Sequence, residues 1–96
     1  MSDLIDRPEA NRLEQAFATP EGGEAMVWVD YGVQGPVRTL LHVEADPALR
    51  GTGAAGRFMQ AVADHARAEG LKLAPRCSYA VAWFKRNPDQ GDVLAS

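Results

Sequence analysis

The sequence contains a single cysteine, Cys77. One cysteine cannot form an internal disulfide, so nothing indicates an oxidising compartment, and a cytoplasmic location is expected. Long apolar runs are also missing, because every such stretch is far shorter than the roughly 20 residues that cross a bilayer. Residues 1–6 are acidic and lack the basic and apolar regions of a secretory signal. We therefore expect no membrane association.

Positive charge is scarce as well. Ten Lys and Arg residues stand against thirteen Asp and Glu residues, which gives a net charge of −3 and a pI near 5.2. This balance argues against nucleic-acid binding, which relies on a cationic surface. The charge is uneven, however: residues 1–48 hold nine acids and three bases, whereas residues 49–96 hold four acids and seven bases. The second half would therefore suit an anionic small ligand.

The chain does contain enough apolar material for one modest core. Of its 96 residues, 46% are hydrophobic and 24% are charged, which is typical of a globular protein. A chain of this length suits one domain and no more. We expect residues 1–96 to form a single domain, with residues 1–8 and 90–96 loosely ordered.

The first half of the sequence predicts strands. Residues 24–33 and 37–45 are rich in apolar and β-branched residues, and the Gly35-Pro36 break between them predicts an antiparallel hairpin. Residues 11–17 are expected to form a short edge strand. Strict alternation along residues 37–45 places two sets of side chains on opposite faces: Val37, Thr39, Leu41, Val43 and Ala45 on one, and Arg38, Leu40, His42 and Glu44 on the other.

The second half predicts helices. Residues 53–69 carry an apolar stripe at helical spacing, formed by Ala55, Phe58, Met59, Val62 and Ala66, and Gly70 is placed to end that helix. A brief strand is expected at residues 71–74. A second helix should begin at Ser78 as its cap and end before Asn87-Pro88. The aromatic residues expected in the core are Trp28, Tyr31, Trp83 and Phe84.

This order of elements predicts an α+β fold. Its sheet should be mostly antiparallel, with a β-α-β unit over residues 37–74 and a C-terminal helix.

A glycine-rich turn, Arg-Gly-Thr-Gly-Ala-Ala-Gly at residues 50–56, lies between a strand and the main helix. Such a turn presents unpaired N–H groups and the positive end of the helix dipole, which together suit phosphate. Arg50 can add a charge-assisted hydrogen bond. A turn that merely starts a helix would have the same composition, so spacing alone leaves both interpretations open.

Two familiar nucleotide motifs do not fit this turn. Gly51, Gly53 and Gly56 satisfy G-x-G-x-x-G, but that fingerprint should follow the first strand of a parallel sheet, and here it follows an antiparallel hairpin. No acid ends the following strand, where Pro75 and Arg76 stand instead. A P-loop is excluded because the sequence has no Gly-Lys-Ser/Thr.

Arg50-x-x-Gly53-x-Ala55 matches the Q/R-x-x-G-x-G/A signature that binds coenzyme A in GNAT acetyltransferases. Over residues 6–94 the sequence resembles the small GNAT-like family of about 90 residues that lacks the superfamily's N-terminal helices. The resemblance is carried in order by Asn11-Arg12-Leu13-Glu14, His42-Val43-Glu44, Leu49-Arg50-Gly51, Gly70-Leu71-Lys72, Pro75-Arg76-Cys77 and Arg86-Asn87-Pro88. Valine replaces the family's threonine in His42-Val43-Glu44, and Asn87 replaces its histidine.

The resemblance implies an acetyl-CoA-binding domain of the GNAT fold. It implies that the phosphates lie at the glycine-rich turn and that the strand near Glu44 and Ala45 holds the pantetheine arm through backbone groups. The implied cofactor-binding residues are Glu44, Ala45, Arg50, Gly51, Thr52, Gly53, Ala54 and Ala55. The tyrosine that serves larger acetyltransferases as general acid corresponds to Phe84, and Cys77 stands where those enzymes have an asparagine. No metal is implied.

Three side chains are candidates for acetyl-transfer chemistry. Cys77 follows Arg76 and precedes a helix, two features that favour a thiolate, which could accept acetyl as a covalent intermediate; the thiol form could instead protonate the departing coenzyme A. Alternatively, Cys77 is a small apolar core residue. His42 and Glu44 lie on one predicted strand face, where either could take a proton from an amine, directly or through water. Alternatively, both are partly exposed polar residues, or Glu44 simply pairs with Arg38.

The sequence thus predicts an N-acetyltransferase acting on a small-molecule or protein amine. The alternative is a coenzyme A- or acyl-CoA-binding module without catalysis, which would act as a sensor or dock a partner. The absence of N-terminal helices, and of a tyrosine at the general-acid position, favours this alternative. The sequence leaves the acceptor and the oligomeric state open.

Overall fold

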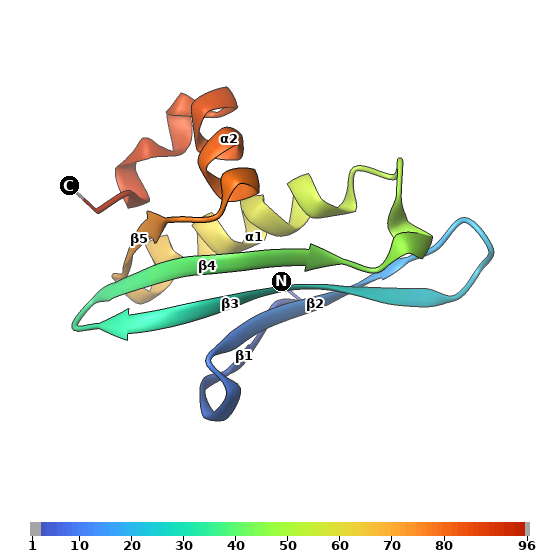
Figure 1. The fold of residues 1–96 in the computed structure, drawn as a ribbon, viewed down its shortest axis with the longest axis horizontal. Helices are drawn as coiled ribbons and strands as arrows, with labels where there is room; N and C mark the ends of the chain where they lie inside the picture. The colour runs from blue at the N-terminus through green and yellow to red at the C-terminus, as the bar shows by residue number, and fades with distance from the viewer. Residues whose placement is uncertain (1–2, 96) are drawn as a thin grey trace.

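Five strands form one mixed sheet in the computed structural model, which describes residues 3–95. The strands lie side by side in the order β1-β2-β3-β4-β5, antiparallel throughout except for the parallel pair β4 and β5. Helices α1 and α2 lie on the same side of this sheet (Figure 1). The elements are β1 (Ile5–Arg7), η1 (Pro8–Ala10), β2 (Arg12–Ala18), β3 (Glu24–Gln34), β4 (Val37–Ala45), η2 (Pro47–Leu49), α1 (Ala54–Glu69), β5 (Lys72–Pro75), α2 (Ser78–Arg86) and η3 (Pro88–Val93).

The predicted fold class is confirmed, including the β-α-β unit, which is β4-α1-β5, and the C-terminal helix α2. The prediction for β4 matches in its bounds, and Gly70 ends α1 with a left-handed φ of 69°. The strand predicted at residues 11–17 is β2, but it is not the edge of the sheet, because β1 pairs with Arg12–Glu14. Only three exposed residues form β1, too few for the apolar alternation that identifies a strand.

Helix α2 begins one residue earlier than predicted. Cys77, and not Ser78, is the capping residue: its backbone is extended, and its Sγ accepts a hydrogen bond from the Ala80 N–H at 3.3 Å. Ser78 is already the first helical residue. Serine is the commoner cap in proteins, and this preference led the prediction to the wrong residue. Asn87 ends the helix as predicted.

Both ends of the chain, for which the sequence predicts loose order, carry structure in their described parts. Residues 5–7 are β1. The C-terminal turn η3 is held to α1 by a bidentate ion pair, in which Nε and Nη2 of Arg67 donate to Oδ2 and Oδ1 of Asp92 at 2.7 and 2.8 Å. The hydrogen bonds from Arg67 lower the pKa of the Asp92 carboxyl. Met1, Ser2 and Ser96 lie outside the described residues. Within residues 3–95, no helix is both long enough and apolar enough to span a bilayer.

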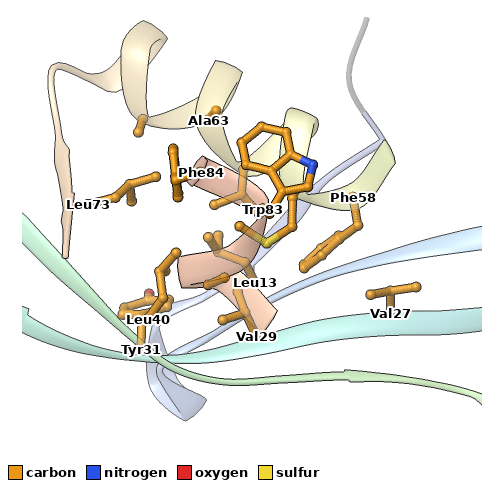
Figure 2. Close-up of a cluster of buried hydrophobic side chains, with 14 of the residues drawn as sticks. Leu13, Val27, Val29, Tyr31, Leu40, Phe58, Ala63, Leu73, Trp83 and Phe84 are labelled. Carbon is orange, nitrogen blue, oxygen red and sulfur yellow. The ribbon is translucent and has the colours of Figure 1, made fainter. Parts of the chain in front are cut away.

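The core lies between the sheet and the two helices (Figure 2). Its largest fully buried side chains are Phe58, Leu40, Met59, Leu73, Val27, Val29 and Val62. Trp83 and Phe84 of α2 close it with an edge-to-face contact at 5.0 Å, and Tyr31 is also buried, as predicted. Trp28 is not in the core; it is half-buried on the helix-free face of the sheet. In α1, Ala54 is buried and Ala55 is only half-buried, so the apolar stripe begins one residue earlier than predicted.

Strand β4 carries a β-bulge that the sequence did not reveal. Tyr31 pairs with Leu40 and Asp30 pairs with His42, so Leu41 is an extra residue with no partner on β3. The alternation of side chains shifts at this point, because Leu40 is fully buried whereas Leu41 is 52% exposed.

The bulge changes which side chains of β4 share a face. Val43 and Ala45 pack against the core together with Leu40, while His42 and Glu44 are exposed on the helix-free face. The prediction that Leu40 shares a face with His42 and Glu44 is therefore wrong. The prediction assumed that side chains alternate strictly along β4. A bulge inserts an extra residue into one strand only, so the alternation shifts at that point.

Tyr31 links β3 to the N-terminal strand. Its hydroxyl donates a hydrogen bond of 2.7 Å to Asp6, and burial together with this bond raises the pKa of Tyr31 to about 12. An unfolded tyrosine ionises near pH 10. Between these values the folded protein keeps a proton that the unfolded chain loses, so stability should fall as the pH rises above 10.

Tyr31→Phe should remove this pH dependence, because phenylalanine has no proton to lose. At neutral pH the variant should lose about 1 kcal/mol, the usual net value of one hydrogen bond. Urea unfolding between pH 8 and 11 measures both effects. Tyr79→Phe is the matched control, since it retains Tyr31 and should still lose stability at alkaline pH. An unchanged alkaline decline in Tyr31→Phe would show that other groups cause it.

Candidate functional site

A cleft opens where β4 and β5 separate. Their pairing ends at Leu40 and Pro75, and the N–H groups of Arg76 and Cys77 both donate to the Leu40 carbonyl, after which the chain turns away into α2. Beyond Leu40, β4 pairs only with β3 within the described residues. The cleft has a volume of about 410 Å³. It is lined by Glu44, Ala45, Asp46, Pro47, Leu49, Arg50, Gly51, Gly53, Ala54, Ala55, Gly56 and Tyr79.

The glycine-rich turn forms one wall of this cleft and is braced from within. The Thr52 hydroxyl donates to the Leu49 carbonyl at 2.6 Å and accepts from the Ala54 N–H at 3.2 Å. Gly51 and Gly53 adopt left-handed φ values of 79° and 77°, which other residues rarely adopt. The sequence therefore forms this turn because glycine stands at both positions and threonine stands between them.

The turn leaves a group of N–H donors without acceptors. The first hydrogen bond of α1 runs from the Arg57 N–H to the Gly53 carbonyl. Within residues 3–95, the N–H groups of Gly51, Gly53, Ala55 and Gly56 have no acceptor. They lie at the positive end of a 16-residue helix, so the wall is suited to bind an anion.

Two arginines add positive charge to this wall. Arg50 lines the cleft, is exposed, and forms no ion pair with any described residue. Arg57 donates from Nη1 to the Thr52 carbonyl at 2.9 Å and stacks over the Phe17 ring at 5.5 Å. The sequence did not suggest Arg57 for this site, because helical periodicity places it on the polar side of α1. Its position in the first turn of the helix is the signal that could have found it.

The predicted cofactor-binding residues lie together around the cleft. Seven of the eight line it, and the eighth, Thr52, braces the turn from behind. The backbone of β4 also contributes. The Asp46 N–H donates to the Met26 carbonyl on β3, and backbone direction alternates along an antiparallel ladder. It follows that Val43 and Ala45 turn their N–H and C=O groups toward the cleft, whereas the backbone of Glu44 faces β3.

His42 and Glu44 are in contact. Nε2 of His42 lies 2.6 Å from Oε2 of Glu44, and both side chains are exposed. This contact is a hydrogen bond between the imidazole and the carboxyl group. Glu44 also lines the cleft, so this pair lies where the cleft meets the helix-free face of the sheet.

Cys77 lies at the point where β4 and β5 separate, but it does not line the cleft. Its N–H is bonded to Leu40, its Sγ caps α2, and its side chain packs partly against the core. The side chain of α2 that does line the cleft is Tyr79, which the sequence interpretation missed, while Phe84 is buried in the core. Tyr79 stands one helical turn before Trp83, and this i, i+4 spacing from a core residue is the signal that could have found it.

The chain is similar to known proteins in both sequence and structure. The sequence matches the profile of the family described as GCN5-related N-acetyl-transferase over residues 16–93. The structure is similar to the NMR solution structure of a GCN5-like protein from Staphylococcus aureus, with a TM-score of 0.60 and 22% sequence identity, covering 100% of this chain and 92% of the other. At this identity the structural likeness concerns the fold alone. A search of curated proteins gives no match.

Proposed function

Because this chain belongs to the GCN5-related N-acetyltransferase family, we propose that it transfers the acetyl group of acetyl-CoA to an amine. Members of this family generally use acetyl-CoA. The observation that carries the proposal is the cleft, which is lined by unpaired N–H donors and an unpaired arginine and has Glu44 at its edge. In this proposal residues 1–96 act as one acetyl-CoA-binding domain.

The glycine-rich turn fits the pyrophosphate of coenzyme A. Four N–H groups without acceptors, together with Arg50, form a donor set suited to phosphate oxygens. A Cβ added at Gly51 would meet no protein atom within 4 Å, so the backbone there faces open space. Arg57 would add charge from the side of the turn. The cationic half of the sequence thus holds the anionic end of the ligand.

The free edge of β4 would hold the pantetheine arm. Val43 and Ala45 present backbone donors and acceptors on the side from which β5 has departed. An amide-containing chain laid along this edge would add hydrogen bonds in the manner of an extra strand. This arrangement differs from the sequence prediction, which named the backbone of Glu44 together with Ala45.

Acetyl-CoA supplies an acetyl group activated as a thioester. The protein must accept a proton from the amine and help to supply one to the departing thiolate. An amine is protonated at neutral pH and must lose a proton before it can react. Glu44 is the proposed acceptor of that proton: His42 holds its Oε2, and Oε1 has no partner within the described residues. Tyr79 lines the cleft, and its hydroxyl is the group proposed to return a proton to the departing thiolate. Cys77, beside the point of strand separation, is the second candidate for that step or for carrying the acetyl group.

The test is amine-dependent release of free coenzyme A thiol from acetyl-CoA. Glu44→Gln should lower kcat by roughly 100-fold or more, the usual range for removal of a general base. It should also abolish the loss of rate at low pH, because that limb reports protonation of the base. Glu69→Gln, the same change on the helix side of the molecule, should leave the rate unchanged. Equal rates in the two variants would remove Glu44 from the mechanism.

The rival function is coenzyme A binding without catalysis. Its supporting observation is that Cys77 does not line the cleft, while Glu44 and His42 are exposed and not enclosed in an acceptor pocket. Saturable binding of coenzyme A, with no thiol release for any amine tested, would favour the rival.

A further inference from the structure

The helix-free face of the sheet carries an ordered row of side chains that leads to the cleft. Ile5 pairs with Glu14, Glu14 with Trp28, and Trp28 with Glu44, so these four residues form one row across β1, β2, β3 and β4. Both helices lie on the opposite side of the sheet (Figure 1). Glu44, the last residue of the row, also lines the cleft. A molecule lying along this row would therefore reach the site proposed for acetyl-CoA.

A groove of about 720 Å³ occupies the other end of the row. Its walls consist of apolar side chains and acidic ones in nearly equal number, with one arginine. They are Asp3, Leu4, Ile5, Arg7, Glu14, Ala16, Glu24 and Met26. Trp28, half-buried, lies between this groove and Glu44. The face thus offers the apolar side chains of Met26 and Trp28 between the carboxylates of the groove and that of Glu44.

The charge of this face is negative, because its two arginines are already paired. Nε of Arg7 lies 3.4 Å from Oε2 of Glu14. Nε of Arg12 lies 3.0 Å from Oδ1 of Asp30. Arg12 also stacks on the Trp28 ring at 5.2 Å, so it forms a wall beside the row.

Several carboxylates on this face have no such partner. Within residues 3–95, Asp3, Glu24 and Glu44 form no ion pair with Lys or Arg. The cleft wall, in contrast, carries the unpaired Arg50. The two sides of Glu44 therefore suit ligands of opposite charge.

We propose that the acceptor is a linear aliphatic diamine or polyamine that lies across the strands along this row. This inference rests on the proposed transfer of acetyl to an amine and names the amine. One nitrogen lies at Glu44, the methylene chain packs on Trp28 and Met26, and the distal ammonium lies among the carboxylates of the groove. Glu14 and Glu44 flank Trp28 at a separation of two strand spacings, about 10 Å, which is comparable to the length of extended 1,6-diaminohexane. A monoamine would leave Asp3 and Glu24, the acids of the groove that form no ion pair with described residues, without a cation.

The proposed reaction balances without a further reactant. The nitrogen at Glu44 gives up one proton to that carboxylate, and its lone pair forms a bond to the thioester carbonyl carbon while the carbon–sulfur bond breaks. The new amide nitrogen loses a second proton, and the departing thiolate of coenzyme A takes up that proton, while the proton on Glu44 passes to water. The distal ammonium does not react; its role is to position the chain.

The experiment is a titration followed by NMR on indole N–H signals, without acetyl-CoA. The chain has two tryptophans, Trp28 on the helix-free face and Trp83 in the core, so the second is an internal reference. Addition of 1,6-diaminohexane should shift the Trp28 signal saturably and leave Trp83 unchanged. Hexylamine, which has the same chain and one ammonium, should bind at least tenfold more weakly. Added salt should weaken the binding of the diamine.

A matched pair of variants locates the distal ammonium. Glu14→Gln removes a carboxylate of the row and releases Arg7, so the preference for the diamine over hexylamine should disappear. Glu69→Gln makes the same change on the helix side and should keep the preference. Equal affinity for the two amines in the parent protein would overturn the inference. So would an unshifted Trp28 signal, or binding of a lysine-rich peptide but not of the diamine.

This measurement separates the inference from the function on which it rests. Diamine binding at Trp28, with no thiol release in the presence of acetyl-CoA, would uphold the acceptor surface and refute the transferase. Rapid acetylation of an amine that does not shift Trp28, with no binding of the diamine, would uphold the transferase and refute this acceptor.

Discussion

Gly53→Val should weaken coenzyme A binding by at least 100-fold. Gly53 stands at the start of α1 with φ at 77°, and its N–H is one of the donors without an acceptor. A Cβ added at this position would lie 3.6 Å from Nη1 of Arg57. The branched valine would cover neighbouring N–H groups and displace Arg57 from the turn. Loss of several charge-assisted hydrogen bonds, each worth about 1.5–3 kcal/mol, accounts for the expected magnitude.

The matched control is Gly70→Val. Gly70 ends the same helix with φ at 69°, and no protein atom lies within 4 Å of its added Cβ. Both substitutions place valine in the left-handed region, at a cost of roughly 1–2 kcal/mol. Both variants should therefore lose similar stability in urea unfolding, while calorimetric titration detects lost coenzyme A binding only in Gly53→Val. Equal affinity in the two variants would place the phosphates elsewhere.

Local signals in the sequence were sufficient for much of this fold. The helix end at Gly70 and the strand break at Gly35 follow from the conformational freedom of glycine, which a single residue type reveals. The β-α-β unit follows from the order of periodic segments. The glycine-rich turn consists of consecutive residues, so its composition is visible in the sequence, and the structure places those residues in one wall of the cleft.

Features that depend on pairing between distant segments were not predictable in the same way. The three exposed residues of β1 form a strand because β2 offers them a free edge. Trp28 looks like a core residue in the sequence, but it faces away from the helices because of its register with Val27 and Val29. Which face of a strand is buried is a property of the whole sheet, so hydrophobicity alone misplaces such residues.

The candidate catalytic residues also depend on contacts between distant segments, which the sequence does not reveal. Cys77 stood out because of its neighbours in sequence, yet its position is set by the cap of α2 and the bond to Leu40. Tyr79 carried no motif, and it lines the cleft only because Trp83, one turn further along, is fixed in the core. A site whose residues come from the ends of different helices and strands can be identified only when the positions of those elements in the fold are known.

The bulge at Leu41 allows a direct test of how the cleft arises. Strands β4 and β5 pair up to Leu40, and the bulge follows at the next residue. A bulge bends its strand and increases its twist, so it would direct the rest of β4 away from β5. Deleting Leu41 would make Leu40 and His42 consecutive, with their partners Tyr31 and Asp30 already adjacent on β3. The register and the inward and outward faces of β4 would therefore be preserved, and only the bend would be lost.

The Leu41 deletion should fold and should bind coenzyme A at least tenfold more weakly than the parent. The amides of Val43 and Ala45 should exchange with solvent more slowly, because a straight β4 lies closer to the chain that follows β5. Leu41→Ala is the control: it removes the same exposed side chain but keeps the extra residue, so it should bind coenzyme A as the parent does. Titration calorimetry and amide hydrogen exchange measure both effects. A deletion variant with parental affinity and unchanged exchange would mean that the departure of the chain at Pro75, and not the bulge, opens the cleft.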